Sequence, residues 1–110
     1  MNSRQKGKRG ELELAKILKS YGFDTRRGQQ YSGIAGDADV VGVPGLHIEA
    51  KRVEKLNVEE ALKQAERDAR AGEIPVVIHR ANNTEWKVTM RLDAFVPIYV
   101  KALGAGDEKL

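Results

Sequence analysis

The segment over residues 39–52, DVVGVPGLHIEAKR, limits the possible fold more than any other part of the sequence. Two runs rich in β-branched residues flank a proline–glycine pair, which predicts two antiparallel strands joined by a tight turn. Apolar and polar residues alternate in the second run, so His47, Glu49 and Lys51 share one face of that strand. Acidic residues are disfavoured in strands, yet Asp39 begins the first strand and Glu49 lies within the second.

The length of the turn decides whether these two acids meet. A strict two-residue turn would place Asp39 opposite Ala50, on the other face from Glu49. A three-residue loop over residues 43–45 would place Asp39 opposite Glu49, because such loops end in a residue with positive φ and Gly45 suits that position. A bulge at the glycine of the first strand would produce the same shift. We expect the three-residue loop.

The rest of the chain predicts an α/β domain with a central mixed sheet flanked by helices. Apolar spacing, caps and turn residues define the expected elements: a helix over 8–21 ended by Gly22, a strand over 23–27, the strands 39–43 and 46–52, a helix capped by Asn57 and closed by Gly72, strands over 75–81 and 85–91, and a helix over 93–103 that begins at or bends near Pro97. We expect one domain over residues 1–110, frayed at about 1–5 and 104–110.

Composition excludes several classes of protein. The chain contains no cysteine, which rules out disulfides, thiolate zinc sites and a cysteine nucleophile. Apolar runs are too short for a transmembrane helix, and no apolar segment of a secretory signal follows the charged N-terminus. Any metal must therefore be held by carboxylates, histidines or carbonyls, and carboxylates and carbonyls suit Mg or Mn.

Positive charge is concentrated at the start of the chain. Residues 1–30 carry eight basic and three acidic side chains, a net charge of +5, whereas the remainder carries −2. This asymmetry favours a polyanionic partner such as nucleic acid over a solvated basic tail. The side chains that we expect to contact phosphates are Lys6, Lys8, Arg9, Arg26, Arg27, Ser32, Arg52 and Lys55.

A third acid, Glu11, lies near the apolar stripe of the first helix, whereas Glu13 points to the solvent side. Glu11 either has a partner, such as a metal or a base, or meets solvent in a fraying first turn. An acid pair beside a lysine suits a hard divalent cation, because the metal cancels the repulsion between the carboxylates. The lysine can then orient a water or stabilise charge on a phosphate under attack.

These motifs together resemble a known family. The matching residues are Lys6-Gly7, Glu11-Leu12-Glu13-Leu14, Tyr21-Gly22-Phe23, Asp39-Val40-Val41, Ile48-Glu49-Ala50-Lys51, Gly72 to Val77 and Trp86. In this order they resemble the archaeal-type Holliday junction resolvases of the PD-(D/E)xK nuclease superfamily. The resemblance spans nearly the whole chain and implies a restriction-endonuclease-like fold. Small phage-encoded nucleases, including the VRR-NUC type, share the central motif.

The resemblance also implies roles for individual residues. Asp39, Glu49 and the carbonyl of Ala50 would bind Mg or Mn, Lys51 would be the catalytic lysine, and Glu11 would be the first-helix glutamate of such resolvases. Ala38 stands where the superfamily name has proline, and the neighbouring Asp37 could compete as a metal ligand. His47 could bind metal or shuttle protons, although a packed strand residue is the simpler interpretation. Gln64 matches an active-site glutamine of some relatives, but its helical position favours an exposed side chain.

The implied activity is hydrolysis of branched DNA by a homodimer in the cytoplasm of a bacterial, archaeal or phage-infected cell, with no membrane contact. Two alternatives stay open. One is a related nuclease that cuts flaps, nicks or duplex DNA, and the other is a DNA-binding module that has lost catalysis. An intact set of Asp39, Glu49 and Lys51 argues against the module, because binding alone gains nothing from a buried acid pair.

Overall fold

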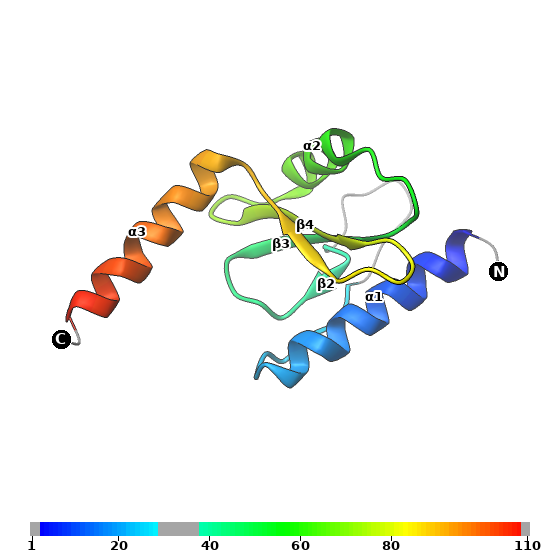
Figure 1. Cartoon of the computed structure of the whole chain (residues 1–110), viewed down its shortest axis with the longest axis horizontal. Coiled ribbons are helices and arrows are strands. Elements are labelled where there is room, and N and C mark those ends of the chain that lie inside the picture. The colour runs from blue at the N-terminus through cyan, green and yellow to red at the C-terminus, as the bar shows by residue number, and fades with distance from the viewer. Residues whose placement is uncertain (1–2, 29–37, 109–110) are drawn as a thin grey trace.

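The structure, a computed structural model, describes residues 3–28 and 38–108. Within these ranges it contains three helices and five strands (Figure 1). In chain order they are α1 (Ser3–Ser20), β1 (Arg26–Arg27), β2 (Val40–Val41), β3 (Leu46–Arg52), α2 (Val58–Asp68), β4 (Ile74–Arg80), β5 (Lys87–Thr89) and α3 (Leu92–Glu108).

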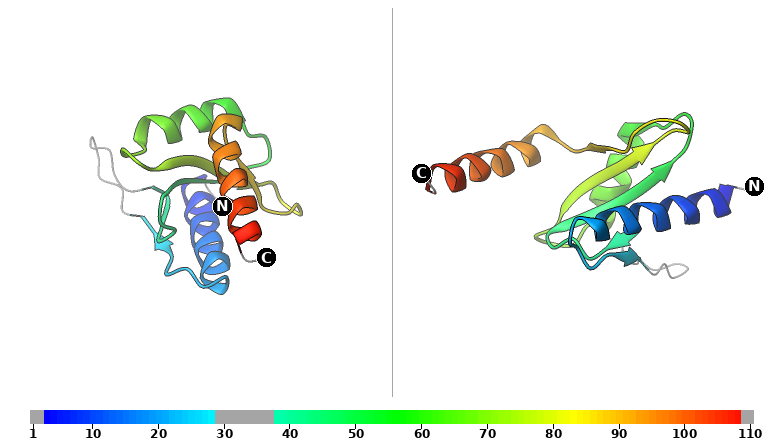
Figure 2. Two further views of the ribbon diagram at one scale, coloured as in Figure 1. Left: turned by 90° about the vertical axis from the view of Figure 1, so that its left-hand side faces the viewer. Right: turned by 60° about the horizontal axis from the view of Figure 1, so that its bottom comes forward.

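The five strands form one mixed sheet in the order β1-β2-β3-β4-β5. Neighbouring strands are antiparallel except β3 and β4, which are parallel and joined through α2. Helices α1 and α2 lie on opposite faces of the sheet, and α3 extends away from it (Figures 1 and 2). This architecture confirms the predicted mixed sheet flanked by helices. Every helix in the described ranges is too short or too polar to span a bilayer.

The core divides into two layers, one on each face of the sheet. The larger layer packs against α1 and consists of Leu14, Ala15, Val40, Ile48, Ala50, Val76 and Ile78. The smaller one packs against α2 and consists of Ala61, Leu62 and Val77. The even-numbered residues of β3 therefore face α1. Its odd-numbered residues, including Glu49 beside Val77, face the α2 side.

The hairpin of β2 and β3 has the predicted register. Val40 pairs with Ile48, and the backbone N–H of Asp39 donates to the carbonyl of Ile48 at 2.9 Å. Gly45 has a φ of +84°, as expected for the end of the loop over residues 43–45. The sequence argument that places Asp39 opposite Glu49 is thus confirmed.

Several predicted boundaries were wrong. Helix α1 begins at Ser3 rather than residue 8, since the preceding Gln, Lys and Arg residues are good helix formers. Helix α2 ends at Asp68 with Ala69 as its C-cap, well before Gly72. Helix α3 begins at Leu92 and continues through Pro97 to Glu108, so its end is helical where fraying was expected.

Three of the strands are also shorter than predicted. Strand β1 has two residues, β2 has two and β5 has three, although each predicted run had five or more. β-propensity favours extended backbone, but a ladder forms only where a neighbouring strand is in reach. The cap of α2 was predicted correctly, because the side chain of Asn57 accepts from the N–H of Glu60 at 3.1 Å.

Gly42 provides a test of the hairpin geometry. Its φ is +111°, and a Cβ there would overlap the backbone carbonyl of Asp24, whereas a Cβ at Gly45 would meet open space. Gly42→Ala should therefore lower the free energy of unfolding by about 3 kcal/mol or more, and Gly45→Ala by about 1 kcal/mol from φ strain alone. Urea denaturation of both variants measures the difference. Equal losses would show that the close approach at Gly42 is unimportant.

Candidate active site

One cavity brings together the residues that the sequence analysis expects to bind metal or to act in catalysis: Glu11, Asp39, Glu49, Ala50 and Lys51. It has a volume of about 380 Å³ and lies among α1, the end of β3 and the flank of α2. Its lining consists of Lys6, Gly7, Glu11, Asp39, Glu49, Ala50, Lys51, Arg52, Val53, Glu54 and Gln64. Residues up to 58 positions apart in the chain thus share one recess, which we call the acidic cavity.

Asp39 and Glu49 are the acids at its base. Asp39 lies directly before β2, and its Oδ2 accepts a hydrogen bond from the backbone N–H of Ala50 at 2.9 Å. Glu49 lies in the middle of β3 and is only 4% exposed. The hairpin register places both side chains on the same face of the sheet, where they interact directly.

Proximity and burial separate the pKa values of the two acids. Burial first, and then the negative charge of Glu49, raise the pKa of Asp39 to about 7, against the bond from Ala50. Burial also acts to raise the pKa of Glu49, but hydrogen bonds from His47 and Asp39 and the charge of Lys51 outweigh it and lower that pKa. One proton is therefore shared within the pair and resides mainly on Asp39.

His47 supports Glu49 from the same face of β3. The ring is 2% exposed, with Nε2 at 3.3 Å from Oε1 of Glu49 and Nδ1 at 3.7 Å from Oε1 of Glu73. Its hydrogen bond to Glu49 raises the pKa of His47, although burial opposes this. His47 lines a second cavity of about 380 Å³ with Arg26 and Asp68, outside the acidic cavity.

Glu11 lies in the middle of α1, because the helix begins at Ser3 rather than at residue 8. Its Oε1 accepts from Nε of Arg27 at 2.7 Å, and its side chain is 17% exposed. The charge of Glu11 also contributes to the raised pKa of Asp39. The sequence left open whether Glu11 has a partner or meets solvent, and the structure shows that it has one. The same ion pair means that Arg27 is bound to an acid of the protein itself.

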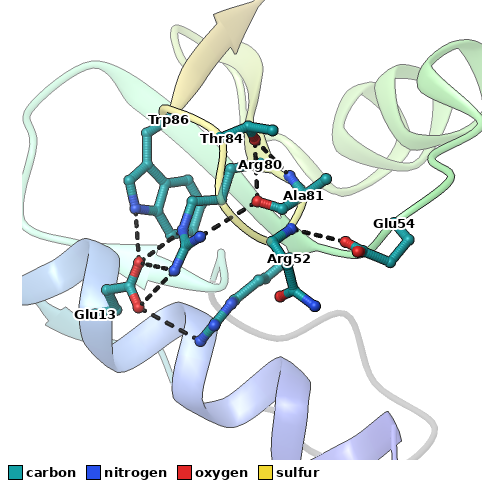
Figure 3. Close-up of polar contacts among 8 residues, drawn as sticks. Glu13, Arg52, Glu54, Arg80, Ala81, Thr84 and Trp86 are labelled. Atoms are coloured by element: carbon teal, nitrogen blue, oxygen red, sulfur yellow. Dashed lines mark hydrogen bonds and ion pairs between the residues drawn. The ribbon is translucent and has the colours of Figure 1, made fainter.

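Glu13 is a correction to the sequence analysis, which placed it on the solvent side. Its carboxylate accepts from Arg80 at 2.8 and 3.1 Å, from Nε1 of Trp86 at 2.9 Å and from Arg52 at 3.4 Å (Figure 3). The guanidinium of Arg80 also lies 5.5 Å from the ring centroid of Trp86. Glu13 therefore ties α1 to β3, to β4 and to the segment before β5.

Gln64 lines the acidic cavity and is half-buried, so the expectation of an exposed side chain was wrong. Helical periodicity predicts only how far Gln64 lies from the apolar stripe of α2. It cannot show that the end of β3 lies beside this side of the helix.

The predicted phosphate-contacting residues differ in exposure and in the cavity that they line. Lys8, Arg9 and Lys55 are exposed, and Lys6 is half-buried at the acidic cavity. Next to it, Lys6, Arg9, Arg52 and Asn82 line a basic cavity of about 350 Å³. Asn82, in the β4–β5 turn, was not identified from sequence, where it is only a turn residue. Arg26 is exposed at the His47 cavity, whereas Ser32 and Asp37 lie outside the described residues.

Two overlapping groups of residues have the chemistry to hold a metal ion. The first consists of the carboxylates of Asp39 and Glu49 and the backbone carbonyl of Ala50, whose oxygens suit Mg or Mn. Two crowded carboxylates repel each other when no cation offsets their charges, and the raised pKa of Asp39 reflects this repulsion together with burial. A divalent ion would remove the repulsion, so this group fits such an ion. The second consists of His47, Glu49 and Asp68, whose ligand atoms lie within 4.8 Å of one another, but its imidazole is already engaged by two glutamates.

Comparison with known proteins agrees with this geometry. A family model described as phage putative PDDEXK endonuclease matches residues 2–103. Among solved structures, the chain is similar to the 1.6 Å structure of Hjc from Archaeoglobus fulgidus, a Holliday junction resolvase from an archaeal hyperthermophile. The identity is 25% and the TM-score 0.53, over 76% of each chain. A search of curated proteins found no match.

The raised pKa of Asp39 predicts a pH dependence of stability in EDTA. Between about pH 4 and pH 7 the folded protein retains a proton that the unfolded chain releases, so stability should fall as pH rises through that window. Asp39→Asn should remove this part of the decline, on the order of 2–4 kcal/mol between pH 5 and pH 8. Urea denaturation across this range measures it. The control Asp93→Asn, at an exposed position of α3, should keep the decline, and a decline unchanged in Asp39→Asn would contradict the assignment.

Proposed function

Because the chain belongs to the phage putative PDDEXK endonuclease family, we propose that it is a metal-dependent endonuclease that resolves four-way DNA junctions by hydrolysing phosphodiester bonds. The observation that carries the proposal is the acidic cavity, which brings Asp39, Glu49 and Lys51 together with Glu11. An acid pair that retains a proton at neutral pH is costly for a protein that only binds DNA, since phosphates repel it.

Asp39 and Glu49, with the carbonyl of Ala50, would hold Mg or Mn. A divalent ion bound there supplies Lewis-acid polarisation of the scissile phosphate and lowers the pKa of a water ligand. His47 keeps Glu49 ionised and oriented through its hydrogen bond. Asp39 is oriented by the N–H of Ala50 and must release its proton before it can serve as a ligand.

Lys51 follows Glu49 by two residues on β3 and lines the same cavity. Its ammonium group can orient the attacking water and stabilise the negative charge that develops on the phosphate. Glu11 lines the same cavity from α1, and its carboxylate is held by the guanidinium of Arg27. We assign Glu11 to the orientation of water or metal on the α1 side of the cavity, and Gln64 to the same task on the α2 side.

The basic cavity suits a phosphate that flanks the scissile one. Lys6 and Arg52 line both cavities, so a DNA strand could pass from one to the other without leaving protein contact. Lys8 and Lys55 are exposed and are assigned to phosphates outside the two cavities. Arg26 and Ser32 are assigned to more distant phosphates.

Junction specificity is the finer part of the proposal. It is supported by the similarity to an archaeal Holliday junction resolvase. A junction has two-fold symmetry, so we propose a homodimer with one site for each strand cut, acting in the cytoplasm of a bacterial, archaeal or phage-infected cell. The competing substrates are flaps, nicks and duplex DNA, and cleavage of a panel of these forms beside an immobile junction distinguishes them.

Cleavage should require Mg or Mn, and chelation with EDTA should abolish it. Asp39→Asn, Glu49→Gln and Lys51→Ala should each reduce the rate of cleavage at least about 100-fold, while DNA binding persists. The matched control is Glu60→Gln, at an exposed position of α2. Single-turnover cleavage with gel-shift binding measures both properties, and full activity in EDTA would refute the proposed function.

DNA affinity should depend strongly on salt through the start of α1. Replacing Lys6, Lys8 and Arg9 together with alanine should reduce the slope of log affinity against log salt by up to about three, since each phosphate contact contributes close to one. Replacing the exposed lysines Lys63, Lys87 and Lys101 is the control. Titrations at several salt concentrations provide the slopes, and equal slopes for the two triple variants would show that the α1 lysines are merely solvated.

A further inference from the structure

Helix α3 presents a large apolar surface to solvent. It extends away from the sheet and from both other helices (Figures 1 and 2). Seven of its large apolar side chains are between 40% and 75% exposed: Leu92, Phe95, Val96, Ile98, Tyr99, Val100 and Leu103. Together they expose on the order of 600 Å² of apolar area, using about 150–200 Å² for each free side chain. This is at the upper limit for a monomer, and it approaches the ~800 Å² that each partner buries in a stable complex.

The residue that leads into α3 is anchored to α2. The guanidinium of Arg91 donates to Glu59 at 2.8 and 3.1 Å and to Glu66 at 2.9 and 3.1 Å, both on α2. The carbonyl of the same residue accepts from the N–H groups of Ala94 and Phe95, which begins the helix. Four side-chain bonds therefore hold the residue directly before α3 against α2.

The apolar residues of α3 have a spacing that is the same when the helix is read in the opposite direction. Leu92, Val96, Tyr99 and Leu103 are spaced by four, three and four residues, which is the spacing of a coiled-coil seam. At 100° per residue these four fall within about 60° of one another, whereas Lys101 lies on the opposite side. The order four, three, four reads the same in both directions, so two antiparallel copies place Leu92 against Leu103 and Val96 against Tyr99.

We propose that α3 is the surface through which two copies of this chain associate, as an antiparallel helix pair about a two-fold axis between Val96 and Tyr99. An isologous contact requires such self-complementarity, and the 4-3-4 seam supplies it. Phe95 and Val100 flank the seam on opposite sides, so under the same symmetry each lies on the same side of the pair as its own counterpart in the other copy. The inference deepens the homodimer of the proposed function by naming its interface.

Sedimentation equilibrium of the full chain tests the association. The wild-type protein should have twice the 12.2 kDa chain mass at micromolar concentration. Tyr99→Glu, in the centre of the seam, should have the mass of one chain, and the control Lys101→Glu, on the opposite side, should stay dimeric. Circular dichroism checks that both variants remain folded. A monomeric wild type, or a dimeric Tyr99→Glu, would overturn the proposal.

The orientation of the two helices has its own test, since the chain contains no cysteine. A mixture of Leu92→Cys and Leu103→Cys proteins should form the mixed disulfide under mild oxidation, and neither protein alone should cross-link. Cross-linking of each protein with itself would indicate a parallel pair and would overturn the antiparallel arrangement.

Nuclease assays separate this inference from the proposed function. Monomeric Tyr99→Glu should still nick DNA in a metal-dependent way, but it should lose paired incision of a junction at least about 10-fold. A dimeric wild type without metal-dependent cleavage would refute the nuclease and leave the interface standing. A wild type that cleaves as a monomer would refute the interface alone.

Discussion

The register between β2 and β3 is the constraint on which the candidate site depends. Val40 and Ile48 pair across the hairpin and are both almost fully buried against α1. A slip of one residue would move Val40 to the opposite face and lose that burial, which is worth about 1.5–3 kcal/mol for one such side chain. Apolar packing on one face thus holds Asp39 and Glu49 together on the other face, against their repulsion.

A second constraint fixes α1 relative to this hairpin. Glu11 and Glu13 are two residues apart and point in directions about 200° apart around the helix. Glu13 is enclosed by Arg52, Arg80 and Trp86, and removal of such a shared acceptor leaves several buried donors without a partner (Figure 3). This anchoring determines which side of α1 faces the sheet. It thereby directs Glu11 toward the acidic cavity.

The sequence allowed prediction where the determinants are local. The hairpin register follows from a glycine and the alternation around it, and the cap of α2 follows from Asn57, so both were predictable. The partners of Glu13 are 39, 67 and 73 residues away, and no periodicity within α1 reports them. The position of Gln64 similarly depends on how α2 crosses the sheet. Tertiary packing also decided the lengths of β1, β2 and β5, where propensity predicted longer runs.

The same pairings determine which positive charges are left for a polyanion. Arg27, Arg80 and Arg91 each donate to carboxylates of the protein itself, and Arg52 does so in part. Of these four arginines only Arg27 lies in the first thirty residues, and its partner Glu11 is one of the acids already counted in the net charge of +5. Within that segment Lys6, Lys8 and Arg9 lie near the N-terminal end of α1, where the helix dipole adds positive potential. A phosphate backbone would consequently approach along the start of α1, and this is also the side on which the acidic cavity is lined by Lys6.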